Sequence, residues 1–193
     1  MAEYDSRRYV LINRWDPSHL KNIDRLLPLS NQRVLEVGCG QGHLTKRLAD
    51  RGVDITGIDA NPNAREVSEC DRVFYMRGEA LEFDDATFDA VLSVHALEHI
   101  PDIEGAISEM ARVLKPGGKA LHIYPAEPIM GLYAIPTSII LHGTPFKARQ
   151  VHCHKLWPSK LRGLMEPTGL AELHSEFQLF KSPQFVSVFE MRA

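Results

Sequence analysis

Short hydrophobic runs alternate with segments of helical periodicity over the first two thirds of the chain. The hydrophobic runs predict strands, and the segments between them carry apolar residues at the spacing of an amphipathic helix. The expected strands cover residues 33–37, 53–58, 72–76, 88–94 and 119–124. The expected helices cover residues 18–27, 43–51 and 101–114, with a further short helix that begins after Asn61 and Pro62. This alternation is typical of a parallel sheet covered on both faces.

The pattern changes after residue 124. Residues 125–155 are rich in Pro, Gly, His and aromatic residues and show no period. A helix is expected at residues 158–166, and two strand-like runs follow at residues 170–180 and 185–191. The turn Lys181-Ser-Pro-Gln184 between these runs favours an antiparallel hairpin at one edge of the sheet. We therefore expect an α/β fold with a doubly wound, mostly parallel sheet and a C-terminal antiparallel hairpin.

Composition bounds the class of protein. The 193 residues are 44% hydrophobic and 24% charged, which suits one globular domain over residues 1–193 and excludes a disordered or fibrous chain. The formal net charge of −3 provides no general basic field for nucleic acid. Three cysteines suit a reducing cytoplasm, and neither the first residues nor the broken apolar stretch at residues 129–141 predicts a signal peptide or a membrane span. The expected location is cytoplasmic.

A glycine loop with flanking acids carries the clearest chemistry. Glu36-Val-Gly-Cys-Gly-Gln-Gly42 follows the first strand, at the sheet edge where such folds bind ligands. Glycines there allow close approach of the backbone and positive φ angles. Asp59 ends the second strand and suits the two hydroxyls of an adenosine ribose. The alternative interpretations are a tight turn for the glycines and a helix-capping or solvated carboxylate for Asp59.

A dinucleotide-binding dehydrogenase is the first rival. Its fingerprint requires a third glycine at the place of His43, and Glu36 would repel a pyrophosphate. A carboxylate at that place instead suits a ligand with a cationic end. The dinucleotide interpretation is therefore disfavoured.

The segment Val34-Leu-Glu-Val-Gly-Cys-Gly-Gln-Gly-His-Leu44 resembles the first motif of class I S-adenosylmethionine-dependent methyltransferases, in the small family often called type 11. Four further blocks resemble this family in order and spacing, at residues 57–62, 78–83, 88–102 and 112–119. The resemblance covers roughly residues 30–124. It implies a seven-stranded sheet with an antiparallel last strand, and S-adenosylmethionine as cofactor.

The resemblance also implies residue roles. Glu36 would face the methionine ammonium, and the backbone from Gly38 to Gly42, with Cys39, Gly40 and Gln41, would pass beneath the methionine and ribose. Asp59 would hold the ribose hydroxyls, and Ala60 would pack against adenine. Glu79 and Ala80 would meet the adenine edge, although the family commonly has Asp where Glu79 stands. Val94 and His95 would lie beside the transferred methyl group, with His95 as a candidate base or a positioning residue.

Histidines and aromatic residues extend the candidate site. His95-Ala-Leu-Glu-His99 has the spacing of a zinc-peptidase motif, but Pro101 limits a helix there and no third ligand is evident. His142, His152 and His154 are a second candidate metal cluster, for which a polar substrate wall is the favoured interpretation. We expect no metal. Residues 125–155 are expected to form a substrate cover, residues 156–193 a C-terminal helix and hairpin, and the substrate residues are expected to be Tyr124, Tyr133, His152 and His154.

The expected acceptor is a small-molecule, glycosyl or lipid-like metabolite, methylated at oxygen or nitrogen, with carbon as a further option. No Asn/Asp-Pro-Pro-Tyr run follows the fourth strand, so DNA is disfavoured as a partner. An RNA-modifying enzyme stays open as an alternative, supported only by the basic residues Lys147, Arg149, Lys155, Lys160 and Arg162. A non-catalytic cofactor-binding activator subunit is the other alternative. Neither the acceptor nor the oligomeric state follows from the sequence.

Overall fold

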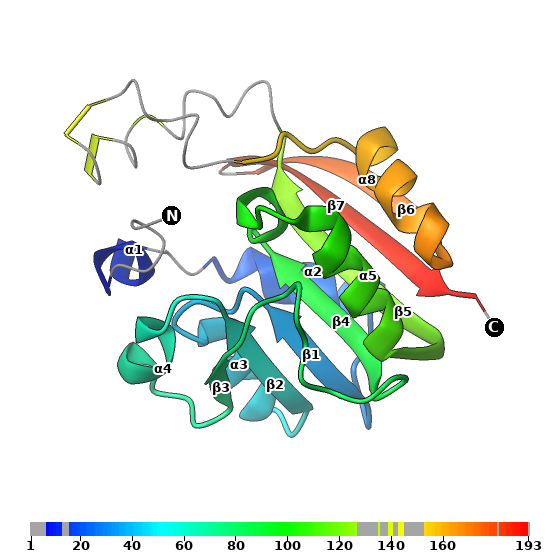
Figure 1. The fold of residues 1–193 in the computed structure, drawn as a ribbon, viewed down its shortest axis with the longest axis horizontal. Coiled ribbons are helices and arrows are strands. Elements are labelled where there is room, and N and C mark those ends of the chain that lie inside the picture. The colour runs from blue at the N-terminus through cyan, green and yellow to red at the C-terminus, as the bar shows by residue number, and fades with distance from the viewer. Residues whose placement is uncertain are drawn as a thin grey trace.

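The computed structural model describes residues 7–12, 16–126, 135, 139–140, 143–144, 153–180 and 182–192. These residues form a seven-stranded sheet in the order β3-β2-β1-β4-β5-β7-β6 (Figure 1). The parallel part comprises β1 (Arg33–Val37), β2 (Asp54–Asp59), β3 (Val73–Tyr75), β4 (Phe88–Val94) and β5 (Leu114–Pro125). In β7 (Ser182–Met191) the chain runs antiparallel to both β5 and β6 (Leu170–Phe180). The expected fold class is confirmed.

Helices cover both faces of the sheet. In Figure 1, α5 (Ile103–Val113) and α8 (Pro158–Met165) lie in front of the sheet, and α2 (Ser18–Leu26) and α3 (His43–Ala49) lie behind it. Two apolar clusters match these layers, one between the sheet and α5 with α8, the other between the sheet and α2 with α3. Burial of apolar side chains on both faces explains the continuous hydrophobic runs of the central strands.

Short elements complete the chain. Helix α1 (Arg7–Ile12) precedes α2, α4 (Asn63–Val67) follows β2, and the 3₁₀ turns η1 (Leu97–His99) and η4 (Glu166–Thr168) follow β4 and α8. Asn61 precedes α4 and accepts a hydrogen bond at Oδ1 from the backbone N–H of Asn63, as expected of a capping residue. None of the helices in the described ranges is long and apolar enough to cross a membrane.

Two expected turns are strand in the structure. Residues 115–118 belong to β5, which begins at Leu114 opposite Phe88 and resumes regular pairing at Lys119, with a register shift between. Gly117 has φ 75° there, so a glycine-rich sequence produced an irregular strand rather than a separate turn. At the expected turn of residues 181–184, β7 begins at Ser182, which pairs with Phe180 of β6. Gln184 then pairs with both Gln178 of β6 and Pro125 of β5.

Candidate functional site

The glycine loop lies at the carboxyl ends of the central strands. The backbone N–H groups of Gly38 and Cys39 both donate to the carbonyl oxygen of Ile58, at 2.8 and 2.9 Å, and so tie the loop to β2. Gly38, Gly40 and Gly42 have φ angles of 77°, 53° and 73°. Positive φ is accessible to glycine at little cost, so this sequence can keep the loop flat against the strand ends.

Close packing also requires two of these glycines. A Cβ atom on Gly38 would lie 2.2 Å from Cβ of Ala96, directly after His95. A Cβ atom on Gly42 would lie 2.4 Å from Cγ2 of Val73 in β3. The loop is therefore wedged between the end of β4 and the edge of β3, and a side chain at either position would displace it.

Glu36 is a buried acid at the base of this loop, with 3% of its surface exposed. Its Oε2 accepts a 2.5 Å hydrogen bond from the Thr45 hydroxyl of α3. Burial raises the pKa of Glu36 to about 7, although the hydrogen bonds from Thr45 oppose the shift. A cationic group bound beside Glu36 would favour its ionised form, which fits the ammonium expected there.

Asp59 ends β2 with both carboxylate oxygens oriented by the backbone. Oδ2 accepts from the N–H of Gly40 and Oδ1 from the N–H of Asn61, each at 2.8 Å. Burial raises the pKa of Asp59 and these two hydrogen bonds oppose the shift. Each oxygen keeps a further lone pair, so two ribose hydroxyls can still donate to it. Ala60 follows on the exposed surface, where a flat ring could lie against it.

Two loop residues face the protein rather than solvent. Cys39 is buried, its Sγ lies 3.8 Å from the carbonyl oxygen of Gly40, and burial raises the pKa of its thiol. It is a packing residue and not a reactive nucleophile. Gln41 donates from Nε2 to the carbonyl oxygen of Val10 in α1, at 2.9 Å. Helix α1 is thereby attached to the glycine loop.

The loop after β3 presents Glu79 and Ala80. Arg77 donates from Nε to Glu79 Oε1 at 2.9 Å, and Ala80 is exposed. Arg112 of α5 holds this loop with hydrogen bonds to the carbonyl oxygens of Leu81 and Phe83, at 3.0 and 2.8 Å. Glu79, which stands where the family commonly has Asp, is therefore engaged by Arg77.

His95 directly follows Val94 of β4 and has a positive φ of 51°. Such backbone strain in a residue other than glycine is often found at functional sites. Its Nδ1 lies 3.6 Å from Oε1 of Glu98, and its Nε2 lies 3.2 Å from Oε1 of Gln184. Burial lowers the pKa of His95, but the hydrogen bond and negative charge of Glu98, with Gln184, outweigh burial and raise it.

The neighbours of His95 are functional candidates that the sequence analysis missed. Glu98 and Gln184 are buried, and the ring of His19 in α2 lies 5.5 Å from the ring of His95. Burial, with the charge of His95, lowers the pKa of His19 to about 4, so His19 is neutral near pH 7. No local motif marks Gln184 or His19, because they reach His95 only through the pairing of β7 with β5 and the packing of α2.

The expected substrate residues have mixed outcomes. Tyr133 and His152, like His142, lie outside the described residues. His154 is described, and its Nε2 lies 2.9 and 3.2 Å from the carbonyl oxygens of Ile100 and Pro101, which attaches it to the loop after β4. Tyr124 differs from the expectation of substrate contact, because it is fully buried and its hydroxyl lies 2.9 Å from Oγ of Ser187. It is a core residue of β5.

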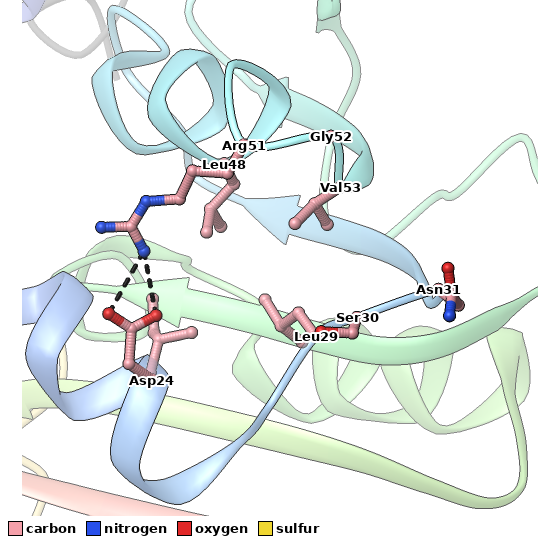
Figure 2. A pocket seen from close by; sticks show the side chains of 9 residues that line it. Asp24, Leu29, Ser30, Asn31, Leu48, Arg51, Gly52 and Val53 are labelled. Atoms are coloured by element: carbon pink, nitrogen blue, oxygen red, sulfur yellow. Dashed lines mark hydrogen bonds and ion pairs between the residues drawn. The ribbon is translucent and has the colours of Figure 1, made fainter.

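A separate pocket of about 330 Å³ lies near the amino ends of β1 and β2, away from the glycine loop. Its walls come from α2, α3 and the segments before β1 and β2, and Figure 2 shows Arg51 extending to Asp24 beside it. Since the glycine loop lies at the carboxyl ends of the strands, this pocket is no part of the candidate site. Among the described residues no group of His, Cys, Asp and Glu could hold a metal ion.

The geometry fits a nucleoside ligand with a cationic end. A buried acid, Glu36, stands beside a cradle of glycine backbone that side chains would fill, and Asp59 stands at the neighbouring strand end. These features fit S-adenosylmethionine, whose ammonium and ribose hydroxyls would meet the two acids.

Comparisons with known proteins agree with this geometry. Residues 35–122 match the family described as Methyltransferase domain. The chain is 40% identical over 113 residues to the ubiquinone biosynthesis O-methyltransferase of Paracidovorax citrulli (strain AAC00-1), covering 53% of this chain and 48% of that protein. It is 35% identical over 113 residues to the protein of the same name from Xylella fastidiosa (strain 9a5c), covering 54% and 46%. This chain thus matches about half the length of these curated relatives.

Solved structures show the same fold at low sequence identity. A putative methyltransferase from Bacillus halodurans C-125 has a TM-score of 0.69 and 17% identity, covering 91% of this chain and 100% of that chain. A putative methyltransferase of Haloferax volcanii, solved with the Trm112 methyltransferase activator, has a TM-score of 0.71 and 18% identity, covering 91% and 88%. Together with the sheet order and the glycine loop, these matches show that the chain has the class I methyltransferase fold and that its residues 35–122 match a methyltransferase domain.

Proposed function

We propose that this chain is an S-adenosylmethionine-dependent methyltransferase acting on a small-molecule, glycosyl or lipid-like metabolite, with in-line transfer to oxygen or nitrogen. The observation that carries the proposal is the pair of acids at neighbouring strand ends, the buried Glu36 and the half-buried Asp59, on the two sides of a glycine loop. The family match at residues 35–122 supports it. Among acceptors, a hydroxyl oxygen is the best supported. The Glu98 carboxylate beside His95 makes its imidazole a stronger base, and the curated relatives are named O-methyltransferases.

The position of each residue determines its role in binding the donor or orienting the acceptor. Glu36 binds the ammonium end, the backbone of residues 38–42 carries the ligand, and Asp59 accepts from the ribose hydroxyls. Glu79 and Ala80 flank the adenine edge, with Ala60 against the ring. Bound S-adenosylmethionine supplies an electrophilic methyl group on a sulfonium. Val94 and His95 orient the acceptor, and His95 takes its proton when the acceptor is a hydroxyl.

The RNA alternative has less support from the described basic residues. Arg162 forms an ion pair with Glu172, so its charge is compensated. Lys160 donates to the carbonyl oxygen of Lys155 at 3.2 Å, and its Nζ lies 5.5 Å from the ring centroid of Trp157. Lys147 and Arg149 lie outside the described residues.

A binding and transfer experiment tests the proposal. Calorimetry should show binding of S-adenosylmethionine and of its demethylated product to the purified chain. A panel of phenols, sugars, amines and bulk RNA, each incubated with methyl-labelled donor, should place label on a hydroxylated small molecule. Failure of both ligands to bind would overturn the proposal. Donor binding without transfer to any acceptor would favour the activator-subunit alternative, and label on RNA alone would favour the RNA alternative.

A further inference from the structure

A row of side-chain amides connects His95 to an ion pair between α2 and β6. Gln184 of β7 lies beside His95, Gln178 of β6 lies opposite Gln184, and Asn22 of α2 contacts Gln178. The row ends at Glu176, which forms an ion pair with Arg25 of α2. Gln184 and Asn22 are buried, so these amides are largely removed from solvent. Figure 1 shows β7 between β5 and the edge strand β6.

The ion pair determines which way the first amide points. Burial raises the pKa of Glu176, but its hydrogen bonds with Arg25, Gln178 and His174 outweigh burial and lower it, so Glu176 is an anion that can only accept. Gln178 lies 2.6 Å from Glu176 Oε1 and must present its NH₂ group there. Its Oε1 therefore points away from Glu176.

The contacts of Arg25 with Asn22 independently require the same orientation of the Gln178 amide. A guanidinium can only donate, so Asn22 presents Oδ1 to Arg25 Nη2, at 3.5 Å, and also accepts from Gln178 Nε2 at 2.7 Å. Asn22 Nδ2 then donates to Gln178 Oε1 at 3.0 Å. An accept-only group and a donate-only group thus require one and the same orientation of the Gln178 amide.

The orientation of the Gln178 amide determines that of Gln184, and Gln184 in turn determines which nitrogen of His95 carries a hydrogen. Because Gln178 presents Oε1 to Gln184, Gln184 must donate from Nε2, over 3.0 Å. Its own Oε1 then faces Nε2 of His95 at 3.2 Å, and an amide oxygen can only accept. His95 must therefore carry a hydrogen on Nε2. In a neutral imidazole the other nitrogen, Nδ1, then holds the lone pair.

We propose that Gln184 is the positioning residue of His95, holding the neutral imidazole as the Nε2–H tautomer so that Nδ1 takes the proton of a hydroxyl acceptor. The role in catalysis rests on the proposed function, whereas the tautomer rests on the hydrogen-bond geometry alone. As the acceptor oxygen forms its bond to the methyl group, the bond between that methyl and the donor sulfur would break, leaving a neutral thioether. The hydroxyl proton moves to Nδ1, so the imidazole carries the positive charge afterwards. Glu98, whose Oε1 lies 3.6 Å from Nδ1, stabilises that charge.

Glu98 and Gln184 act on different nitrogens of the His95 ring, Glu98 on Nδ1 and Gln184 on Nε2. Glu98 and His99 belong to η1, Asp16 precedes α2, and His19 of α2 also forms a hydrogen bond with Gln184. His19 is neutral near pH 7, since burial and the charge of His95 lower its pKa to about 4. The negative groups Glu98 and Asp16 favour the protonated ring, in which Nδ1–H faces Glu98 and Nε2–H faces Gln184. When this ring loses a proton, Gln184 retains the hydrogen on Nε2, so the proton that leaves is the one on Nδ1.

The tautomer can be measured without any substrate. In protein labelled with ¹⁵N-histidine, long-range proton–nitrogen spectra distinguish protonated from unprotonated ring nitrogens between about pH 6 and pH 9. The His95 signals are those missing from a His95→Gln variant. We expect Nε2–H in the neutral wild-type ring. Gln184→Leu should give a mixture of tautomers, and Gln178→Leu, which leaves the Gln184 amide able to rotate, should do the same to a smaller degree.

Matched variants separate positioning from general damage. Gln184→Glu keeps an accepting oxygen and should retain the Nε2–H tautomer, while Gln32→Leu removes a partly buried amide before β1 and should leave the His95 signals unchanged. An Nδ1–H tautomer in wild type would overturn the proposal, as would an unchanged tautomer in Gln184→Leu. If Gln184→Leu does not fold, the wild-type and Gln178→Leu spectra decide.

Turnover provides a second readout once an acceptor is found. Gln184→Leu should lower kcat about 10- to 100-fold, because general-base assistance is worth roughly 10²- to 10⁴-fold and only part of it is lost. The KM for the donor should change less than about threefold, and Gln184→Glu should restore most of kcat at pH values above the pKa of His95, which the added carboxylate raises further. If the tautomer responds as expected but no acceptor is methylated, the proposed function fails alone. If methylation proceeds and the tautomer ignores Gln184, the positioning role fails alone.

Discussion

The Thr45 hydroxyl donates a 2.5 Å hydrogen bond to the Glu36 carboxylate, joining helix α3 to strand β1 beneath the glycine loop. The bond opposes the effect of burial, which nevertheless raises the pKa of Glu36 to about 7. Glu36 is thus a buried acid whose pKa lies well above its ordinary value before any cationic group is bound.

The raised pKa predicts a loss of stability as pH rises. Between the ordinary pKa of 4.5 and about 7, the unfolded chain gives up the Glu36 proton while the folded chain keeps it, so unfolding becomes more favourable. The free energy of unfolding should fall by about 3 kcal/mol over this window and level off above it. Denaturant unfolding at about pH 5 and pH 8 measures the change. Glu36→Gln should lose this component, and equal pH dependence in both proteins would contradict the prediction.

Asp59→Ala should weaken binding of the methyl donor. The loss of two hydrogen bonds from the ribose hydroxyls to a carboxylate corresponds to about 2–4 kcal/mol of binding free energy. Asp54→Ala is the matched control, since Asp54 lies at the other end of β2 and its exposed side chain pairs with Arg72. Calorimetry should show little change for the control. Equal donor affinity in Asp59→Ala and wild type would refute the placement of the ribose.

Gly38→Ala should damage both folding and donor binding. The added Cβ would lie 2.2 Å from Cβ of Ala96, in a residue whose φ is 77°. Gly52→Ala separates the two causes, because Gly52 has φ 84° but open space around the added atom. We expect about 1–2 kcal/mol of destabilisation from backbone strain in Gly52→Ala and roughly 1–3 kcal/mol more in Gly38→Ala. Denaturant unfolding of both variants tests this, and equal losses would show that the close approach to Ala96 is unimportant.

His95→Gln should abolish assistance by a general base while keeping much of the side chain's shape. We expect kcat to fall at least about 100-fold under saturating donor. In wild type, kcat should decline as the pH falls through the pKa of His95, which Glu98 holds above its ordinary value, because protonation fills Nδ1. The variant should lack this acidic limb. Calorimetric donor affinity within a few-fold of wild type shows that the site is intact, and a loss below about tenfold with the limb preserved would leave His95 an orienting residue.

The expected donor-binding residues lie in segments that local sequence motifs mark. Strands β1 and β4 have the predicted bounds, because each is a short, mostly apolar run buried on both faces. The glycine loop, Asp59 and the loop after β3 lie in segments that a contiguous motif marks. Residues 115–118 were predicted as a turn, but they lie within β5 as an irregular stretch that the pairing with β4 skips, between Leu114 and Lys119.

The acceptor side could not be predicted in the same way. Tyr124 alternates along β5 with residues that also face apolar clusters, so only the position of Ser187 in β7 shows that its hydroxyl is satisfied in the core. Gln184 is 89 residues from His95, and Gln178 is 156 residues from Asn22. Contacts between residues so far apart follow from tertiary packing, which no local period encodes. The division into a core, a cover at residues 125–155 and a C-terminal part remains a prediction.

The position of β7 between β5 and β6 has a consequence for the order in which the site matures during synthesis. Glu36, the glycine loop and Asp59 emerge from the ribosome early, and their strands pair with one another without β7. Gln184 is added 89 residues after His95, and it reaches its place only when β7 pairs with β5. A nascent chain can therefore form its donor-binding loop while the imidazole of His95 still exchanges between tautomers. The tautomer that can accept a proton at Nδ1 is selected only when β7 pairs with β5.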